Sequence, residues 1–317
     1  MADHTARSVA EIEAARRMRA DANIKASYRY LRLSVVVLVI TLAVSLLIEM
    51  TAGRTRWLGS ISAYYWTPVH AVFIGALFAM GASFVALKGR DSIEDMSFNL
   101  AGVLAPVVAL VPTRRPGGLC ERCHPVEVDA AALVRNNVPA LGIALFVTIV
   151  VAYVIARLDN RRRPSIPTAA WVGLGLGAAL LVGGVVWYVA GRRSFHDHAH
   201  LTAAAAMFVA IWCAVMVNAG LPRRLLERLY GWLGEEIPEP SRPGFLLTYR
   251  ILAVCMAVSP LILFSGRDHQ IFVVEALEIL PFGVFWALQT AEGWDTGFTA
   301  APAAPGQPVA PVQPAAS

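Results

Sequence analysis

The chain is dominated by long apolar stretches that short polar segments separate. A helix needs about 20 apolar residues to cross a bilayer, and eight stretches reach or approach that length. They cover residues 33–49, 68–88, 97–112, 138–157, 168–191, 200–220, 245–264 and 271–290. The pattern predicts an all-α, polytopic transmembrane helix bundle of about eight spans. The third stretch is short and contains Pro106, so a re-entrant segment is the alternative there.

The amino-acid composition also indicates that most of the chain is surrounded by lipid. Of the 317 residues, 57% are hydrophobic and 15% are charged. Soluble domains carry roughly 25% charged residues. The net charge of +5 could suggest a nucleic-acid partner, but the basic residues are concentrated in alternate loops, as membrane topology requires. We therefore expect no nucleic-acid partner.

The distribution of basic residues predicts the orientation of the bundle. Of the 27 Lys and Arg residues, 17 fall in the tail and loops of one face and 9 in the loops of the other. Cytoplasmic loops carry the excess of Lys and Arg in membrane proteins. Both termini are therefore predicted to be cytoplasmic.

Three regions follow along the chain. Residues 1–32 are predicted to form a cytoplasmic amphipathic helix whose arginines face anionic lipid headgroups. Residues 33–292 form the transmembrane bundle, with an interfacial helix at 222–234 in which leucines recur at helical spacing. Residues 293–317, rich in Ala and Pro, are predicted to be a disordered cytoplasmic tail.

A GxxxG pair, Gly173 and Gly177, lies in the fifth apolar stretch. Small residues at this spacing let two helix backbones approach closely in lipid. Packing against another helix of the same chain is the simpler interpretation. Formation of a homo-oligomer through Gly173 and Gly177 is the alternative.

Ionisable residues inside a bilayer are costly, so each one is a candidate for function. Glu275 and Glu278 are three residues apart and share one face of the last helix. With His70 at the outer end of the second span, they form a candidate proton or cation site. Salt bridges to Arg192, Arg193 or Arg267 are the alternative for the two glutamates. Nearer the cytoplasm, Arg250 is expected either to reach the interface or to pair with Glu292.

His196 and His200 form an HxxxH pair at the start of the sixth span. Two imidazoles four residues apart on a helix can bind one metal ion. His70 or Glu278 would have to complete such a site. Zinc is therefore the one metal that the sequence suggests, although the main expectation is that no cofactor is bound.

Cys120, Cys123 and His124 form a CxxCH sequence in the third loop. This is the attachment pattern of c-type haem. The loop is short for enclosing a macrocycle and offers no clear distal ligand, so we favour a disulfide or free thiols over haem attachment.

Two stretches resemble an uncharacterised family of bacterial multispanning membrane proteins. They are Ser62-Ala-Tyr-Tyr-Trp-Thr-Pro68 and Asn99-Leu-Ala-Gly-Val-Leu-Ala-Pro-Val-Val-Ala-Leu-Val-Pro-Thr113, and the segment with Phe285, Trp286, Gln289 and Glu292 adds to the likeness. The resemblance implies a multi-pass protein of the bacterial plasma (inner) membrane and supplies no activity.

A fainter likeness is to the membrane hydrolase superfamily of alkaline ceramidases and adiponectin-receptor-like proteins. That superfamily holds zinc with three histidines beside a Ser and an Asp. Ser62, Asp95, His70, His196 and His200 are the only counterparts here. The HxxxH pair precedes two further spans instead of lying in the last one, and Asp95 is predicted on the opposite face.

The sequence thus favours a non-enzymatic integral membrane protein with a polar cluster near the outer face. Transport, sensing and envelope organisation all fit this description. The alternative is a zinc-dependent hydrolase that acts on lipid or amide substrates at the outer leaflet, where the metal would activate a bound water molecule.

Overall fold

The computed structural model describes residues 2–51, 57–117, 129–162, 168–238 and 241–294. Within these ranges every regular element is a helix and no strand occurs, which confirms the all-α prediction. Seven of the described helices are long and apolar enough to cross a membrane. The CxxCH residues Cys120, Cys123 and His124 and the tail after residue 294 lie outside the described ranges.

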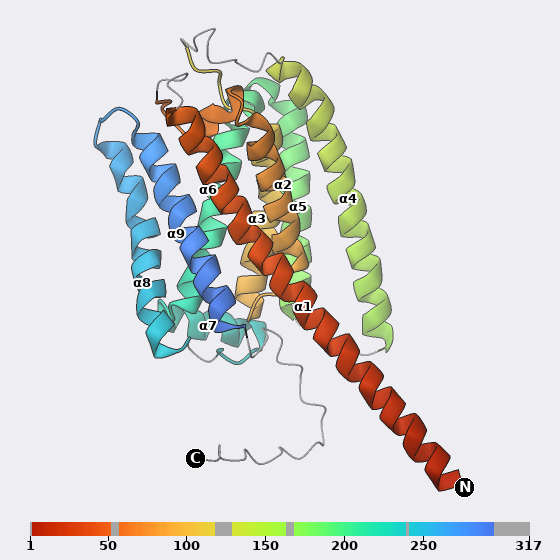
Figure 1. Cartoon of the computed structure of the whole chain (residues 1–317). Helices are drawn as coiled ribbons and strands as arrows, with labels where there is room; N and C mark the ends of the chain where they lie inside the picture. The colour runs from red at the N-terminus through yellow and green to blue at the C-terminus, as the bar shows by residue number, and fades with distance from the viewer. Residues whose placement is uncertain (1, 52–56, 118–128, 163–167, 239–240, 295–317) are drawn as a thin grey trace.

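The long helices run side by side, and one short helix lies across an end of the bundle (Figure 1). In chain order the elements are α1 (Ala2–Thr51), η1 (Ser62–Trp66), α2 (His70–Ala86), α3 (Ser92–Leu110), α4 (Ala130–Arg162), α5 (Thr168–Ala190), α6 (Arg192–Asn218), α7 (Arg223–Leu233), α8 (Pro243–Val258), η3 (Ser259–Phe264) and α9 (Gln270–Glu292). We call the two ends of the bundle the η1 end and the α7 end. They correspond to the predicted outer and cytoplasmic faces.

Helix α1 continues without a break from the predicted cytoplasmic segment into the first apolar stretch. It has 50 residues, which gives a length of roughly 75 Å at 1.5 Å per residue. No proline or glycine occurs before Gly53, so no residue in this range interrupts the backbone hydrogen bonds. Its N-terminal half extends beyond the α7 end of the bundle (Figure 1).

Helices α2 and α3 differ from the sequence expectation in length. Helix α2 is an apolar helix of 17 residues, shorter than the seven candidate spans, so the number of eight spans remains a prediction. Helix α3 is continuous over 19 residues with Pro106 inside it. Half of the most apolar stretch of α3 is buried by other parts of the protein. Neighbouring helices therefore shield from lipid the backbone groups around the proline.

Two glycines set the spacing between α2 and α3. A Cβ atom added to Gly81 would lie 2.9 Å from the carbonyl oxygen of Gly102, and one added to Gly102 would lie 2.7 Å from that of Gly81. Pro106 has no N–H group for the Gly102 carbonyl four residues earlier. The two backbones are therefore close together at the turn of α3 where Pro106 interrupts the hydrogen-bond ladder.

The helices divide into a central group and a peripheral pair. Buried side chains of α1, α2, α3, α6, α8 and α9 share one hydrophobic core. In contrast, the most apolar stretch of α4 has no buried residue, and that of α5 is 6% buried. In a membrane these two helices therefore contact lipid over most of their surface.

The predicted interfacial segment 222–234 contains α7, which lies across the end of the bundle (Figure 1). Leu226 and Tyr230 pack with Val217 and Ile93. Trp232 is largely exposed on the other side. One face of α7 thus packs against the bundle, and the other face is exposed and can contact the membrane–water interface.

We predict that Gly102→Ala destabilises the bundle because the new methyl group would meet the Gly81 carbonyl and the Val85 side chain at 2.7 Å. Overpacking of this kind costs about 1–3 kcal/mol. Gly75→Ala is the matched control on α2, since its Cβ would meet nothing within 4 Å. Thermal unfolding in detergent should show a lower Tm for Gly102→Ala only. Equal Tm values would contradict the close contact.

Candidate functional site

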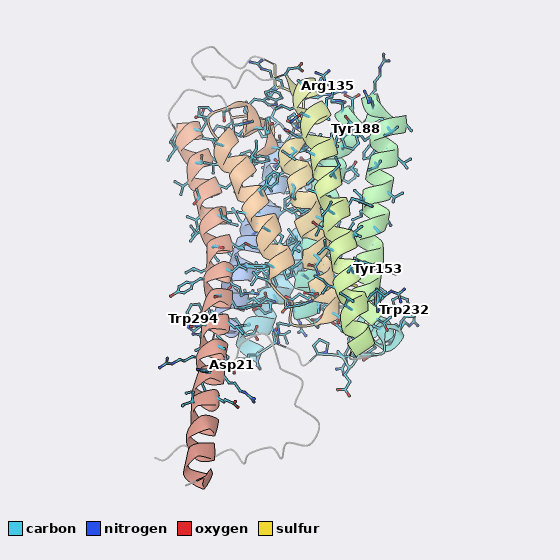
Figure 2. All side chains as sticks on the ribbon, turned by 90° about the vertical axis from the view of Figure 1, so that its right-hand side faces the viewer. Asp21, Arg135, Tyr153, Tyr188, Trp232 and Trp294 are labelled. Carbon is cyan, nitrogen blue, oxygen red and sulfur yellow. The ribbon has the colours of Figure 1, made fainter. Side chains whose placement is uncertain are left out.

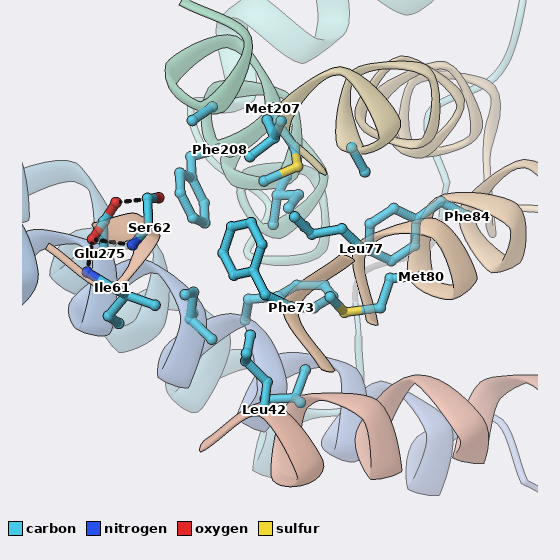
Figure 3. Close-up of a pocket in the computed structure, with 17 residues that line it drawn as sticks. Leu42, Ile61, Ser62, Phe73, Leu77, Met80, Phe84, Met207, Phe208 and Glu275 are labelled. Atoms are coloured by element: carbon cyan, nitrogen blue, oxygen red, sulfur yellow. Dashed lines mark hydrogen bonds between the residues drawn. The ribbon is translucent and has the colours of Figure 1, made fainter. Parts of the chain in front are cut away.

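The η1 end contains a half-buried glutamate, Glu275, whose carboxylate holds η1 against α9. The Glu275 carboxylate accepts hydrogen bonds from the backbone N–H groups of Ile61 and Ser62 and, at 2.7 Å, from the Ser62 hydroxyl. Figure 3 shows these groups converging at one edge of a cavity. All of the donors are neutral, so no positive charge compensates the carboxylate through these contacts.

A small cavity extends from this carboxylate into the interior of the bundle. Its volume is about 50 Å³. Glu275 and Ser62 supply polar atoms at one edge (Figure 3). Phe84, near the end of α2, and Phe282, two turns beyond Glu275 on α9, line it nearer the α7 end. The rest of the wall is apolar. A cavity needs roughly 10–15 Å³ to hold one water molecule, so this one has room for only a few.

Glu278 has a separate environment from Glu275. It is buried, and it accepts a hydrogen bond of 2.5 Å from the hydroxyl of Ser259, which opens η3. Among the described residues, neither glutamate forms an ion pair with an arginine. The salt bridges to Arg192, Arg193 or Arg267 that were the alternative for the two glutamates are therefore not observed.

His70 and His200 at the η1 end form hydrogen bonds with backbone carbonyl groups. The Nδ1 atom of His70 lies 2.8 Å from the Tyr65 carbonyl oxygen, and that of His200 lies 2.6 Å from the Val111 carbonyl oxygen. The Nε2 atom of His200 is buried and has no hydrogen-bond partner. His196 is half-buried, one turn before His200.

The structure does not bring the three predicted zinc ligands together. Within the described ranges, no group of three or more His, Cys, Asp or Glu side chains is placed to hold a metal ion. Asp95, the aspartate of the hydrolase likeness, lies in the first turn of α3 and pairs at 2.9 Å with Lys88 of the α2–α3 connection. It therefore lies at the α7 end, away from the histidines.

The α7 end contains a buried polar network that the sequence did not reveal. Its centre is Gln289, which is fully buried. The Gln289 amide nitrogen donates to the Glu94 carboxylate and, at 3.1 Å, to the Asn218 side-chain oxygen. The Gln289 amide oxygen accepts from the Arg32 guanidinium. One amide therefore bridges a buried cation and a buried anion.

Both charged groups have further partners. Arg32 donates to the Thr290 hydroxyl at 3.1 Å, and its guanidinium lies 4.5 Å from the centroid of the Trp286 ring. Glu94 also accepts from the Asn218 amide at 3.2 Å and from the Arg90 backbone N–H at 2.7 Å. A buried charge is tolerable only when its hydrogen-bonding capacity is used in this way.

A second carboxylate, Glu292, joins the network through Arg90. The Arg90 guanidinium donates to Glu292 at 3.3 Å and to the Ser241 hydroxyl at 2.7 Å. The Tyr249 hydroxyl donates to Glu292 at 2.9 Å. Arg250 instead donates to the Ala219 carbonyl oxygen at 3.2 Å, so the Arg250–Glu292 pair considered from the sequence is replaced by Arg90–Glu292.

Asp91 fixes the start of α3 beneath this network. Its carboxylate accepts from the backbone N–H groups of Ile93 and Glu94, as an N-cap residue does. It also accepts at 2.5 Å from the Tyr230 hydroxyl of α7. Burial raises the pKa of Asp91, and burial together with the Asp91 charge raises the pKa of Tyr230.

An aromatic layer separates the cavity from the network. We use this name for Phe84, Phe98, Phe282, Phe285 and Trp286. The Trp286 ring centroid lies 5.3 Å from that of Phe84, 4.9 Å from that of Phe98 and 5.7 Å from that of Phe282. Arg32 lies against Trp286, so this ring contacts both the layer and the network.

The sequence contained a partial signal for this arrangement. Glu278, Phe282, Phe285, Gln289 and Glu292 recur at helical spacing, so they share one face of α9. That spacing could have marked a face with polar ends and an aromatic centre. The partners of these residues come from distant parts of the chain, and no local pattern identifies them.

No protein-family model matches the chain, and neither the curated proteins nor the solved structures contain a significant match. The resemblances described from the sequence therefore remain hypotheses, and the site must be interpreted from its own chemistry.

We predict that Gln289→Leu destabilises the protein strongly, because it removes one buried hydrogen-bond partner from Arg32 and one from Glu94 at the same time. An unsatisfied buried group costs about 1–3 kcal/mol, and more when it is charged. Thr290→Val removes only one acceptor of Arg32 and should have a smaller effect. Thermal unfolding in detergent compares the two variants, and a larger loss for Thr290→Val would contradict the central position of Gln289.

Proposed function

We propose that the protein is a multi-pass membrane protein that translocates protons through the interior of its helix bundle. The observation that carries this proposal is the arrangement along α9. A half-buried carboxylate at the η1 end, a small cavity, an aromatic layer and a buried charged network follow one another in that order. Between Glu275 and Gln289 the distance along the helix is roughly 21 Å, at 1.5 Å per residue.

Ionisable groups at both ends support a path for protons. Glu275 opens onto the cavity, and its hydrogen-bond partners are all neutral. A carboxyl group of this kind can exist in either protonation state without breaking an ion pair. At the other end, Glu94 and Glu292 offer carboxylates within a hydrogen-bonded network. Intramembrane carboxylates in such chains are typical of proton relays.

The size of the interior space favours the proton over a larger solute. The cavity has room for only a few water molecules. The aromatic layer closes it toward the α7 end, with Phe84 and Phe282 in its wall. Translocation therefore requires a rearrangement of this layer, so the structure corresponds to a closed state on this proposal.

The topology proposed for this activity follows the distribution of basic residues. We propose eight spans, with α2 as the shortest, both termini in the cytoplasm and the η1 end facing outward. The bacterial plasma membrane is the proposed location. In this orientation Glu275 would receive protons from the outer face.

We predict measurable proton flux when the full chain is reconstituted in vesicles that enclose a pH-sensitive dye. A potassium gradient with valinomycin supplies the membrane potential. Glu275→Gln keeps hydrogen-bonding atoms near Ser62 but cannot carry a proton. The flux should therefore fall about tenfold or more, as expected when a proton-transfer group is lost.

Two further variants make the result specific. Phe282→Ala removes part of the barrier between cavity and network and should increase the flux. Glu227→Gln changes an exposed carboxylate of α7 and should leave it unchanged. Flux no greater than in protein-free vesicles, or flux unaffected by Glu275→Gln, would overturn the proposal.

A further inference from the structure

A second and much larger cavity lies outside the central helices. Its volume is about 700 Å³, and residues of α3, α4, α5 and α6 line it. Pockets for small-molecule ligands range from about 300 to 1,000 Å³. The wall is almost entirely apolar, with side chains such as Leu104, Val107, Phe146, Leu180 and Phe195.

Glycines on the outer wall keep this space open. Gly142 of α4 and Gly183 and Gly184 of α5 all line the cavity. A Cβ atom added to any of the three would meet nothing within 4 Å. The helices that carry them are also the pair least buried by protein. The cavity thus lies between the central helices and two helices that face lipid.

The depth of the cavity corresponds to one leaflet of a bilayer. Along α4 its lining runs from Val138 to Phe146, a rise of roughly 12 Å. Half of the hydrocarbon core of a bilayer is about 15 Å thick. The lined residues of α4 belong to its first half, which begins at the η1 end (Figure 1). The space therefore has the position and depth of an acyl chain in one leaflet.

Two arginines, Arg135 and Arg192, lie beside lining residues at the η1 end of the cavity. The Arg192 guanidinium lies 5.5 Å from the ring centroid of Tyr188, which lines the cavity. Arg135 precedes the lining residues Val138 and Pro139 by three and four positions, so it shares their face of α4. Figure 2 shows Arg135 and Tyr188 at the same end of the bundle.

In the described part of the chain, no carboxylate forms an ion pair with these arginines, Arg135 and Arg192. A guanidinium matches the geometry of a phosphate group and can donate two hydrogen bonds to it. An apolar cavity with guanidinium groups at its η1 end is complementary to a molecule that has an acyl chain and an anionic head.

We propose that this cavity binds an anionic phospholipid. One acyl chain fills the space between α4–α5 and α3–α6, and the phosphate lies between Arg135 and Arg192. The site is separate from the path through the central helices, so it does not depend on proton translocation. Phosphatidylglycerol has the required net negative charge, whereas phosphatidylcholine is neutral overall.

The test is retention of lipid by the full-length protein in detergent, measured by native mass spectrometry. The protein is titrated with phosphatidylglycerol and, separately, with phosphatidylcholine of the same chain length. We expect the first lipid to bind about tenfold more tightly, the ratio that corresponds to one favourable charged contact. Equal retention of the two lipids would overturn the assignment of the headgroup site.

A cavity-filling variant tests the acyl-chain site. Gly184→Phe places an aromatic ring of α5 in the cavity. Gly177→Phe on the same helix is the matched control. Gly177 does not line the cavity, and a Cβ atom added to it, as to Gly184, would meet nothing within 4 Å. Phosphatidylglycerol should be lost from the first variant and retained by the second. Retention of phosphatidylglycerol by both variants would show that its acyl chain does not occupy this cavity.

Arginine variants test the headgroup site without altering the packing of the cavity. Arg135→Gln combined with Arg192→Gln should remove the preference for phosphatidylglycerol. Arg157→Gln is the control, because Arg157 also stacks on aromatic rings of α4 and α5 but at the α7 end. If Gly184→Phe fails to fold, this pair still decides the proposal, and an unchanged preference in the double variant would contradict it.

Discussion

The side chain of Gln289 on α9 forms hydrogen bonds with residues of three other helices, α1, α3 and α6. Its amide joins Arg32 of α1 to Glu94 of α3 and also contacts Asn218 of α6. Lipid offers no hydrogen-bond partners to buried charges, so these groups must satisfy one another. A rotation or translation of any one of the four helices would break at least one of these hydrogen bonds. This constraint fixes the arrangement of the central helices at the α7 end.

The two ends of the bundle satisfy their carboxylates in different ways. At the α7 end, Glu292 forms an ion pair with Arg90. The Gln289 side-chain amide there bridges Glu94 and Arg32. At the η1 end, Glu275 and Glu278 accept hydrogen bonds from neutral serine hydroxyls and backbone N–H groups. Protonation of a carboxyl group with neutral partners breaks no ion pair. Protonation of Glu275 or Glu278 would therefore break no ion pair, whereas protonation of Glu292 would break its pair with Arg90.

Helices α4 and α5 are outside this network. Their contact with each other includes the edge-to-face pair of Tyr153 and Trp171 at the α7 end, with Arg157 over both rings. Nearer the η1 end, glycines and apolar side chains leave an open space instead of a packed interface. A lipid bound there would complete the packing that the protein side chains leave unfinished.

Local patterns in the sequence determined the class of the protein and the course of its chain. Apolar stretches of spanning length, which are properties of consecutive residues, predicted an all-α bundle, and the structure has helices over all eight of them. They did not predict that α1 is a single helix of 50 residues, because the change from polar to apolar composition at residue 33 looked like a boundary.

The partners of the polar residues were decided only by the tertiary structure. The sequence placed Glu275 and Glu278 together as one site, but the fold brings Ser62 to the first and Ser259 to the second. It treated Arg32 as part of a tail and Glu94 as part of a loop, whereas both are buried beside Gln289. The contact between Gln289 and Arg32 joins residues 257 positions apart. Hydrophobic periodicity indicates which residues form a helix, but the rotation and pairing of helices depend on contacts between distant segments, which no local pattern encodes.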